Sequence, residues 1–129
     1  MASLVTNAGK DNITAAWHAY ASRMRYLQWG VGSGQGASDT DLADTTGTTE
    51  GRTAGSTSQQ TSDTANDTYR VTGTITALGA RAITEVGVFD GAGSGTPPTG
   101  DNMGIYGDFS VINLSAADSV TFTVDVELD

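Results

Sequence analysis

The chain has 129 residues, which suits one domain with a single core. It carries 15 acidic residues against 6 basic ones, so its average surface, at a net charge of -9, would repel nucleic acid. Cysteine is absent, which excludes disulfides, a thiolate nucleophile and cysteine-ligated zinc. The richness in Gly, Thr, Ser, Asp and Ala favours short strands joined by polar turns, so we expect a mainly β protein.

The opening residues, MASLVTNAGKDNIT, lack the basic start and the unbroken apolar core of a secretion signal. Nowhere along the chain do enough apolar residues follow one another to span a membrane. We therefore expect a soluble protein without an export signal of its own.

Apolar residues at steps of three and four predict one helix of about 12 to 15 residues that starts near Asp11. The periodic residues are Ile13, Ala16, Trp17, Tyr20, Met24 and Leu27. Asp11 or Asn12 would cap the first turn. Arg23 and Arg25 would lie near the C-terminal end, where the helix dipole favours positive charge.

Residues 26–31 alternate, with Leu27, Trp29 and Val31 on one side, and predict a strand. Glycines follow at every second position: Gly30, Gly32, Gly34 and Gly36. A phosphate-binding loop would need an amphipathic helix after the glycines, but the next residues, ASDTDLADTTGTTEG, lack helical periodicity. We expect a strand that ends in a close-packed turn.

Residues 35–67 form a polar tract whose only apolar side chain larger than that of alanine is Leu42. Such a tract cannot build a core of its own. Three alternatives remain open: an extended arm, an exposed strand around residues 50–59, or a mobile segment that becomes ordered on a partner.

The acidic residues of this tract match a calcium loop in ligand type only, because the spacing and the flanking helices of an EF-hand are missing. They are Asp39, Asp41, Asp44 and Glu50. We expect a solvated acidic loop, with Asp41 as a candidate cap of a short helical turn, and no metal site.

Four further strands are predicted over residues 68–78, 82–90, 103–112 and 119–128. In the first, one face holds Tyr69, Val71, Gly73, Ile75 and Ala77, and the other holds Arg70, Thr72, Thr74 and Thr76. In the last, the inward residues are Val120, Phe122, Val124, Val126 and Leu128.

These strands predict an antiparallel β-sandwich, jelly-roll-like or Ig-like, or a small barrel. The expected organisation is a single β-sandwich domain over residues 1–129. It includes an N-terminal segment and helix over residues 1–26, with the arm over residues 35–67 as one alternative.

Serine-type catalysis would have to use His18, the only histidine, as its base. His18 lies in the predicted helix without a neighbouring signature, so we expect it to pack or to face water. Most aromatic residues should be core, with one or two at an interface. They are Trp17, Tyr20, Tyr26, Trp29, Tyr69, Phe89, Tyr106, Phe109 and Phe122. We expect no catalytic residue and no cofactor.

The sequence resembles small structural proteins of tailed bacteriophages in the order of several segments. These are LVTNAGKDNIT, YLQWGVGSG, DTDLADTTGTTEGR, TYRVTGTIT, AITEVGVFD and LSAADSVTFTVDVEL. The resemblance covers most of the chain. It implies a virion β-sandwich: a capsid decoration or cement protein, or a tail-fibre or collar module.

Our first hypothesis is a non-enzymatic decoration or cement protein that stabilises the head by bridging major capsid subunits. Its expected partners are the major capsid protein and copies of itself, with a trimer as the expected oligomer. No nucleic acid, membrane or small-molecule substrate is expected. Residues 1–11 and 35–67 would make the contacts.

Because an acidic protein would not line the DNA-filled interior, we expect it on the outer surface of the head, or on the tail, after synthesis in the host cytoplasm. The first rival hypothesis is a tail-fibre, collar or neck component, or a host-surface binding module, which copy number would distinguish. The second is a hydrolase acting on a host polysaccharide, whose turnover would depend on one carboxylate.

Overall fold

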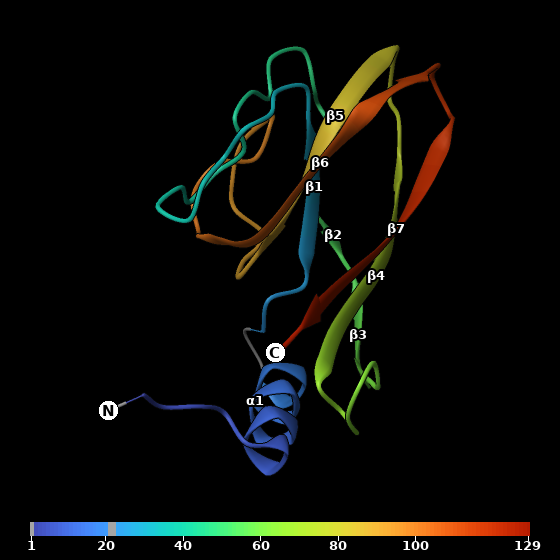
Figure 1. Cartoon of the computed structure of the whole chain (residues 1–129). Coiled ribbons are helices and arrows are strands. Elements are labelled where there is room, and N and C mark those ends of the chain that lie inside the picture. Colours follow the sequence, from blue (N-terminus) through green and yellow to red (C-terminus); the bar gives the residue numbers. More distant parts are fainter. Residues whose placement is uncertain (1, 21–22) are drawn as a thin grey trace.

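Two antiparallel sheets face each other as a sandwich in the computed structural model, which describes residues 2–20 and 23–129 (Figure 1). The four-stranded sheet has the order β2-β1-β5-β6, with β1 (Tyr26–Gly30), β2 (Thr53–Ala54), β5 (Arg81–Phe89) and β6 (Met103–Leu114). The three-stranded sheet has the order β3-β4-β7, with β3 (Ser56–Gln60), β4 (Thr68–Thr76) and β7 (Ser119–Glu127). One helix, α1 (Asn7–Ala19), precedes the strands. The predicted mainly β sandwich is confirmed.

The four strands predicted in the second half of the chain are present, and the predicted alternation of buried and exposed residues holds for β4 and β7 but not for β5. Tyr69, Val71 and Ile75 of β4 are buried, and they pair with inward-facing valines of β7. The core between the sheets consists of Leu27, Trp29, Tyr69, Val71, Ile75, Ala77, Ile83, Val86, Val88 and Phe122. Burial of these side chains supplies the main driving force for the fold.

A second, smaller apolar cluster covers the outer face of the four-stranded sheet. Leu42 packs there against Phe89 of β5 and Met103 of β6. As a result, β5 is buried on both faces and reads as a nearly continuous apolar run in the sequence. The loop that carries Leu42 is therefore part of the folded domain.

The polar tract of residues 35–67 takes the strand alternative. It contains β2 and β3, over residues 53–60, and its residues Thr48, Glu50 and Asp67 are buried. Hydrogen bonds to the sandwich provide the stability that the tract's few apolar side chains cannot. The tract lies against the sheets and is not a detached arm.

The two sides of the sandwich are built differently. On one side the chain passes at Gly55 from β2 in one sheet directly to β3 in the other. A Cβ atom at Gly55 would lie 2.8 Å from Cγ1 of Val71 and 2.9 Å from the carbonyl oxygen of Thr72, so the crossing requires glycine. We call this side, formed by β2 and β3, the closed side.

The edge strands β6 and β7 form the other side, which we call the open side. Each ends the order of its own sheet, and the two strands do not pair with each other. The rings of Phe109 and Phe122 meet across this gap with centroids 6.1 Å apart. Along the strands, side-chain contact joins the sheets here, and at one end the turn of residues 115–118 carries the chain from β6 to β7.

Helix α1 begins at Asn7, so the predicted start at Asp11 is wrong. The cap is Thr6, whose hydroxyl accepts a hydrogen bond from the amide of Gly9 at 3.2 Å. The predicted cap residues Asp11 and Asn12 lie inside the helix. Its length of 13 residues agrees with the prediction.

The helix ends at Ala19, because Tyr20 has extended backbone angles. The periodic pattern had continued to Met24 and Leu27, but Leu27 belongs to β1 and is buried in the core. Arg23 and Arg25 likewise follow the helix and are not part of it. The pattern joined two elements that the structure separates.

Polar contacts hold α1 to the end of the sandwich where β4 begins. Its one buried residue, Thr14, donates a hydrogen bond from Oγ1 to the carbonyl of Asn66 at 2.6 Å and accepts one from Nε2 of Gln59 at 2.9 Å. The ring of Trp17 meets Tyr69 edge-on, with centroids 5.2 Å apart. Most of the apolar stripe of the helix consequently stays at the surface.

The outer face of the three-stranded sheet is lined with polar side chains that bind one another across the strands. The pairs are Thr74 with Thr121 and Thr76 with Ser119, both at 2.7 Å, and Arg70 with Asp125, also at 2.7 Å. Such cross-strand pairs support the register of β4 and β7.

Candidate interaction surface

The glycines after β1 lie under the loop of residues 43–44. A Cβ atom at Gly30 would come 2.7 Å from the carbonyl oxygen of Asp44, and one at Gly32 would come 2.7 Å from Cβ of Ala43. The amide of Val31 donates to the same carbonyl at 2.7 Å. The predicted close-packed turn is confirmed, and residues 37–52 contain no helix that could present its N-terminus to a phosphate.

The four acidic residues considered for calcium act separately. Asp39 accepts the amide of Gly36 at 2.7 Å, and Asp44 accepts the amide of Thr46 at 2.8 Å. Asp41 accepts the amide of the next residue and caps no helix, so that expectation is wrong. Within residues 2–20 and 23–129, no three His, Cys, Asp or Glu side chains gather as a metal site would require.

Glu50, the fourth acidic residue, is a structural anchor beside β2. Its carboxylate accepts hydrogen bonds from the indole of Trp29 at 2.9 Å and the amide of Leu78 at 2.8 Å, and it pairs with Arg81 at 2.9 Å. Burial opposes its ionisation, but these bonds outweigh burial and lower the pKa of Glu50 to about 2. The carboxylate of Glu50 therefore stays ionised and hydrogen-bonded to these partners.

A second buried carboxylate belongs to Glu85, which the sequence pattern did not identify as a structural residue. It accepts hydrogen bonds from the amides of Ala43 and Asp44 and from the hydroxyl of Tyr106 at 2.8 Å. Burial, together with this bond, raises the pKa of Tyr106 to about 12. A lone Glu inside the apolar run AITEVGVF was the available signal, because a buried carboxylate must find partners.

Asp67 is a third buried carboxylate, placed just before β4. It accepts the amides of Thr64, Ser62 and Asp63 at distances from 2.8 to 3.0 Å. The bonds from Thr64 and Ser62 hold the pKa of Asp67 well below its usual range. All three carboxylates thus fasten loops to strands.

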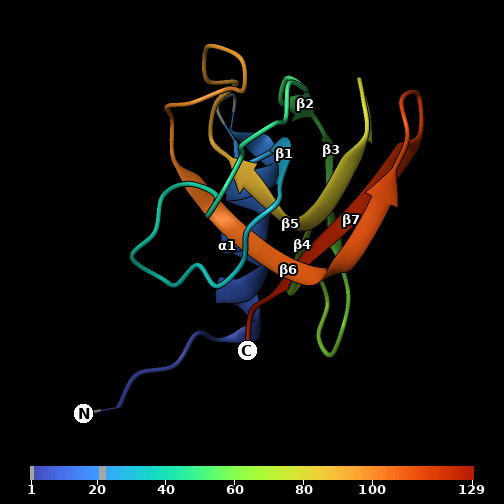
Figure 2. The same cartoon turned by 90° about the horizontal axis from the view of Figure 1, so that it is seen from above.

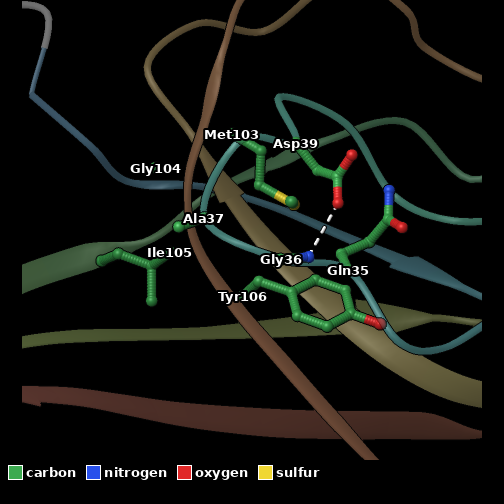
Figure 3. Close-up of a pocket in the computed structure, with 8 residues that line it drawn as sticks. All are labelled: Gln35, Gly36, Ala37, Asp39, Met103, Gly104, Ile105 and Tyr106. Atoms are coloured by element: carbon green, nitrogen blue, oxygen red, sulfur yellow. Dashed lines mark hydrogen bonds between the residues drawn. The ribbon is translucent and has the colours of Figure 1, made fainter.

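A surface hollow of about 280 Å³ lies between the acidic loop and β6 (Figure 3). Gln35 and Asp39 border it on the loop side, and Met103 and Tyr106 border it on the strand side. Because Asp39 is bound to the Gly36 amide and the Tyr106 hydroxyl to Glu85, its polar groups are already occupied. The hollow does not present a reactive arrangement.

His18 links α1 to the closed side. Its Nδ1 atom lies 2.8 Å from the hydroxyl of Thr57 in β3. Among the described residues, no carboxylate is hydrogen-bonded to the imidazole ring, so the third member of a catalytic triad is missing. The predicted packing role for His18 is consistent with this contact.

Exposed apolar side chains gather on the N-terminal segment (residues 2–6) and on α1. Leu4 is 80% exposed and Tyr20 is 66% exposed, and Val5, Ile13 and Trp17 are also exposed. The N-terminal segment points away from the strands in both views, whereas α1 lies at one end of the sandwich in Figure 1 (Figures 1 and 2). An exposed apolar set of this kind is typical of a binding surface.

A hollow of about 270 Å³ adjoins the helix. Trp17, Tyr20 and Met24 line it, with Arg23 and Asp90 also in its wall. Trp, Tyr and Arg are the residues that most often dominate binding energy at protein interfaces. The hollow and the exposed side chains of α1 together form the helix-end surface, which is our candidate interaction surface.

The aromatic residues divide as predicted between core and surface. Trp29, Tyr69 and Phe89 are fully buried, whereas Trp17 and Tyr20 lie on the helix-end surface.

Within the described residues, no helix combines the length and the apolar character that a bilayer crossing requires. Comparisons with protein-family models, curated proteins and solved structures found no match for this chain.

Proposed function

We propose that this protein is a bacteriophage virion component without enzymatic activity, and specifically a capsid decoration or cement protein. The order of phage-like segments in the sequence supports the virion assignment. The sandwich supports a structural role, because its buried carboxylates are all engaged in holding loops. The observation that carries the proposal is the exposed apolar helix-end surface.

In this proposal the helix-end surface contacts the major capsid protein. A Trp–Tyr pair beside a hollow can bury apolar area across the joint between two capsid subunits. Many copies bound only to the closed shell would raise its stability by mass action. Of the two segments expected to make contacts, residues 2–11 stay accessible, whereas residues 35–67 lie largely on the sandwich.

The test is co-sedimentation of the purified protein with empty shells of the major capsid protein from the same phage. Micromolar protein should bind at a copy number close to that of the capsid subunits or of their threefold positions. Absence of binding at that concentration would refute the proposal. A copy number in the low tens on native particles, with the protein on the tail, would favour a tail component.

Two matched variants locate the contact. Tyr20→Asp changes a side chain of the helix-end surface, and Leu78→Asp changes one that is 67% exposed in the turn between β4 and β5. Tyr20→Asp should weaken shell binding by at least about tenfold, and Leu78→Asp should bind like the native protein. Equal binding by both variants would place the contact elsewhere.

A further inference from the structure

The open side exposes apolar surface that the core does not cover. The inward-facing residues Ile105 and Phe109 of β6 and Val120 and Val124 of β7 are only partly buried. Farther along β6, Ile112 pairs with the core residue Ile83 and is 37% exposed. An apolar strip therefore runs between the two edge strands.

Beyond Met103, whose amide donates to the carbonyl of Thr40 at 2.9 Å, the main-chain edges of the open side pair with no other strand. β6 has 12 residues and β7 has 9, and each is the last strand of its sheet. Residues 103–127 contain no lysine and no proline, the residues that usually protect an edge strand from pairing with another chain. The free edges can accept an added strand.

The N-terminal segment, residues 2–6, is suited to that position. Its sequence ASLVT contains no charge or proline, and Thr6 has extended backbone angles. Leu4 and Val5 are exposed and lie outside the apolar clusters of their own domain. Burying them on a neighbour would remove this apolar area from water.

The charges of the two regions are complementary. Residues 2–10 contain Lys10 and no acidic residue, in a chain that has 15 acidic residues. Residues 103–129 contain five acidic residues and no Lys, Arg or His. The acidic residues are Asp108, Asp118, Asp125, Glu127 and Asp129, of which Asp125 pairs with Arg70. The segment therefore approaches an acidic rim without repulsion.

We propose that the open side of one copy receives residues 2–6 of a second copy as an added strand, with Leu4 placed in the apolar strip between β6 and β7. Because the donor and acceptor regions differ, the contact is head-to-tail, and it closes into a ring if the rotation allows. This inference rests on the virion role of the proposed function and adds a contact between copies to it, and it is tested on the free protein without shells.

Cysteine cross-linking tests the contact directly, because the chain has no cysteine of its own. A Leu4→Cys chain is mixed with an affinity-tagged Ile112→Cys chain and oxidised. We expect a mixed dimer on a non-reducing gel. The control mixes Leu4→Cys with Ser56→Cys, which lies on the exposed edge of the closed side. This mixture should give much less of the mixed dimer.

Equal cross-linking to both positions would overturn the proposal. A double Leu4→Cys, Ile112→Cys chain that forms its disulfide only within one chain would also overturn it, because the segment would then dock on its own domain. Failure of either kind would leave shell binding by the helix-end surface standing.

Light scattering on the uncross-linked protein gives the second readout. The native protein should associate, and Leu4→Asp should weaken association by at least about tenfold. Ser3→Asp adds the same charge beside Leu4 and should have a smaller effect. A native protein that stays monomeric at about 100 µM would overturn the proposal, since a functional contact between copies held in a virion shell should be measurable there. Circular dichroism checks that each variant is folded.

Discussion

The closed and open sides belong to the same sandwich but meet solvent in different ways. On the closed side a glycine crossing carries the chain from sheet to sheet, and the ionised Glu50 is bound from three directions. On the open side, two edge strands run past each other with half-buried side chains between them. The difference indicates that the closed side stabilises the fold. The open side, in contrast, leaves strand edges and apolar side chains that a single chain does not cover.

The largest expected effect comes from removing the anchor of the closed side. Glu50→Ala leaves Arg81 and the indole of Trp29 buried without their acceptor, so the free energy of unfolding should fall by about 4 kcal/mol. Urea denaturation measures it. The control, Glu127→Ala, removes an exposed carboxylate of β7 and should cost less than about 0.5 kcal/mol. Equal costs would contradict the comparison.

The same carboxylate should give the protein a marked sensitivity to acid. The pKa of Glu50 lies near 2 in the folded chain, below its ordinary value of 4.5, so its stabilisation is complete above pH 4.5 and is lost as pH falls toward 2. The loss should be about 3 kcal/mol. Denaturation curves across this range should be flatter for Glu50→Gln than for the native protein. Parallel curves would show that another group dominates.

The glycine crossing should be sensitive to a single methyl group. Gly55→Ala forces a contact with Val71 and the Thr72 carbonyl and should cost about 2 kcal/mol. Gly51→Ala is the matched control, because no atom lies within 4 Å of its added methyl group, and it should be neutral within about 0.5 kcal/mol. Thermal unfolding compares them. A neutral Gly55→Ala would mean that the crossing relaxes easily.

The smallest effect on stability is expected on the open side. Val111→Ser replaces a largely exposed side chain, so the unfolding free energy of the dilute, monomeric protein should change by about 0.5 kcal/mol or less. Chemical denaturation at low protein concentration measures this. A cost as large as that of Gly55→Ala would show that the open side already belongs to the core.

The strands of the second half could be predicted because their alternation records burial directly. Tyr69, Val71 and Ile75 are spaced by two, and all three are buried. The helix was harder, because its apolar stripe is mostly exposed and polar contacts from Thr14 hold it in place. The apolar periodicity therefore marked neither the buried face of α1 nor its N-cap, Thr6.

The loops could not be placed from composition, because their positions depend on single long-range contacts. Leu42 fills a site beside Phe89, and Glu85 receives amides more than forty residues away in sequence. The apolar run around Glu85 signals that this residue is buried, but nothing local to either residue identifies its partners. Of the candidate interaction surface, the sequence offered Trp17 and Tyr20 as aromatic residues, but their exposure follows from how α1 sits against β3 and β4.

The cross-strand hydroxyl pairs of β4 and β7 affect how copies behave when crowded. Thr74 and Thr76 already form hydrogen bonds with Thr121 and Ser119. The outer face of this sheet therefore has few hydrogen-bond donors free for another molecule. This face thus offers little for another copy to bind. Copies held densely on a particle would then make only transient contacts through this face. Lasting contacts would form at the helix end and at the strand edges.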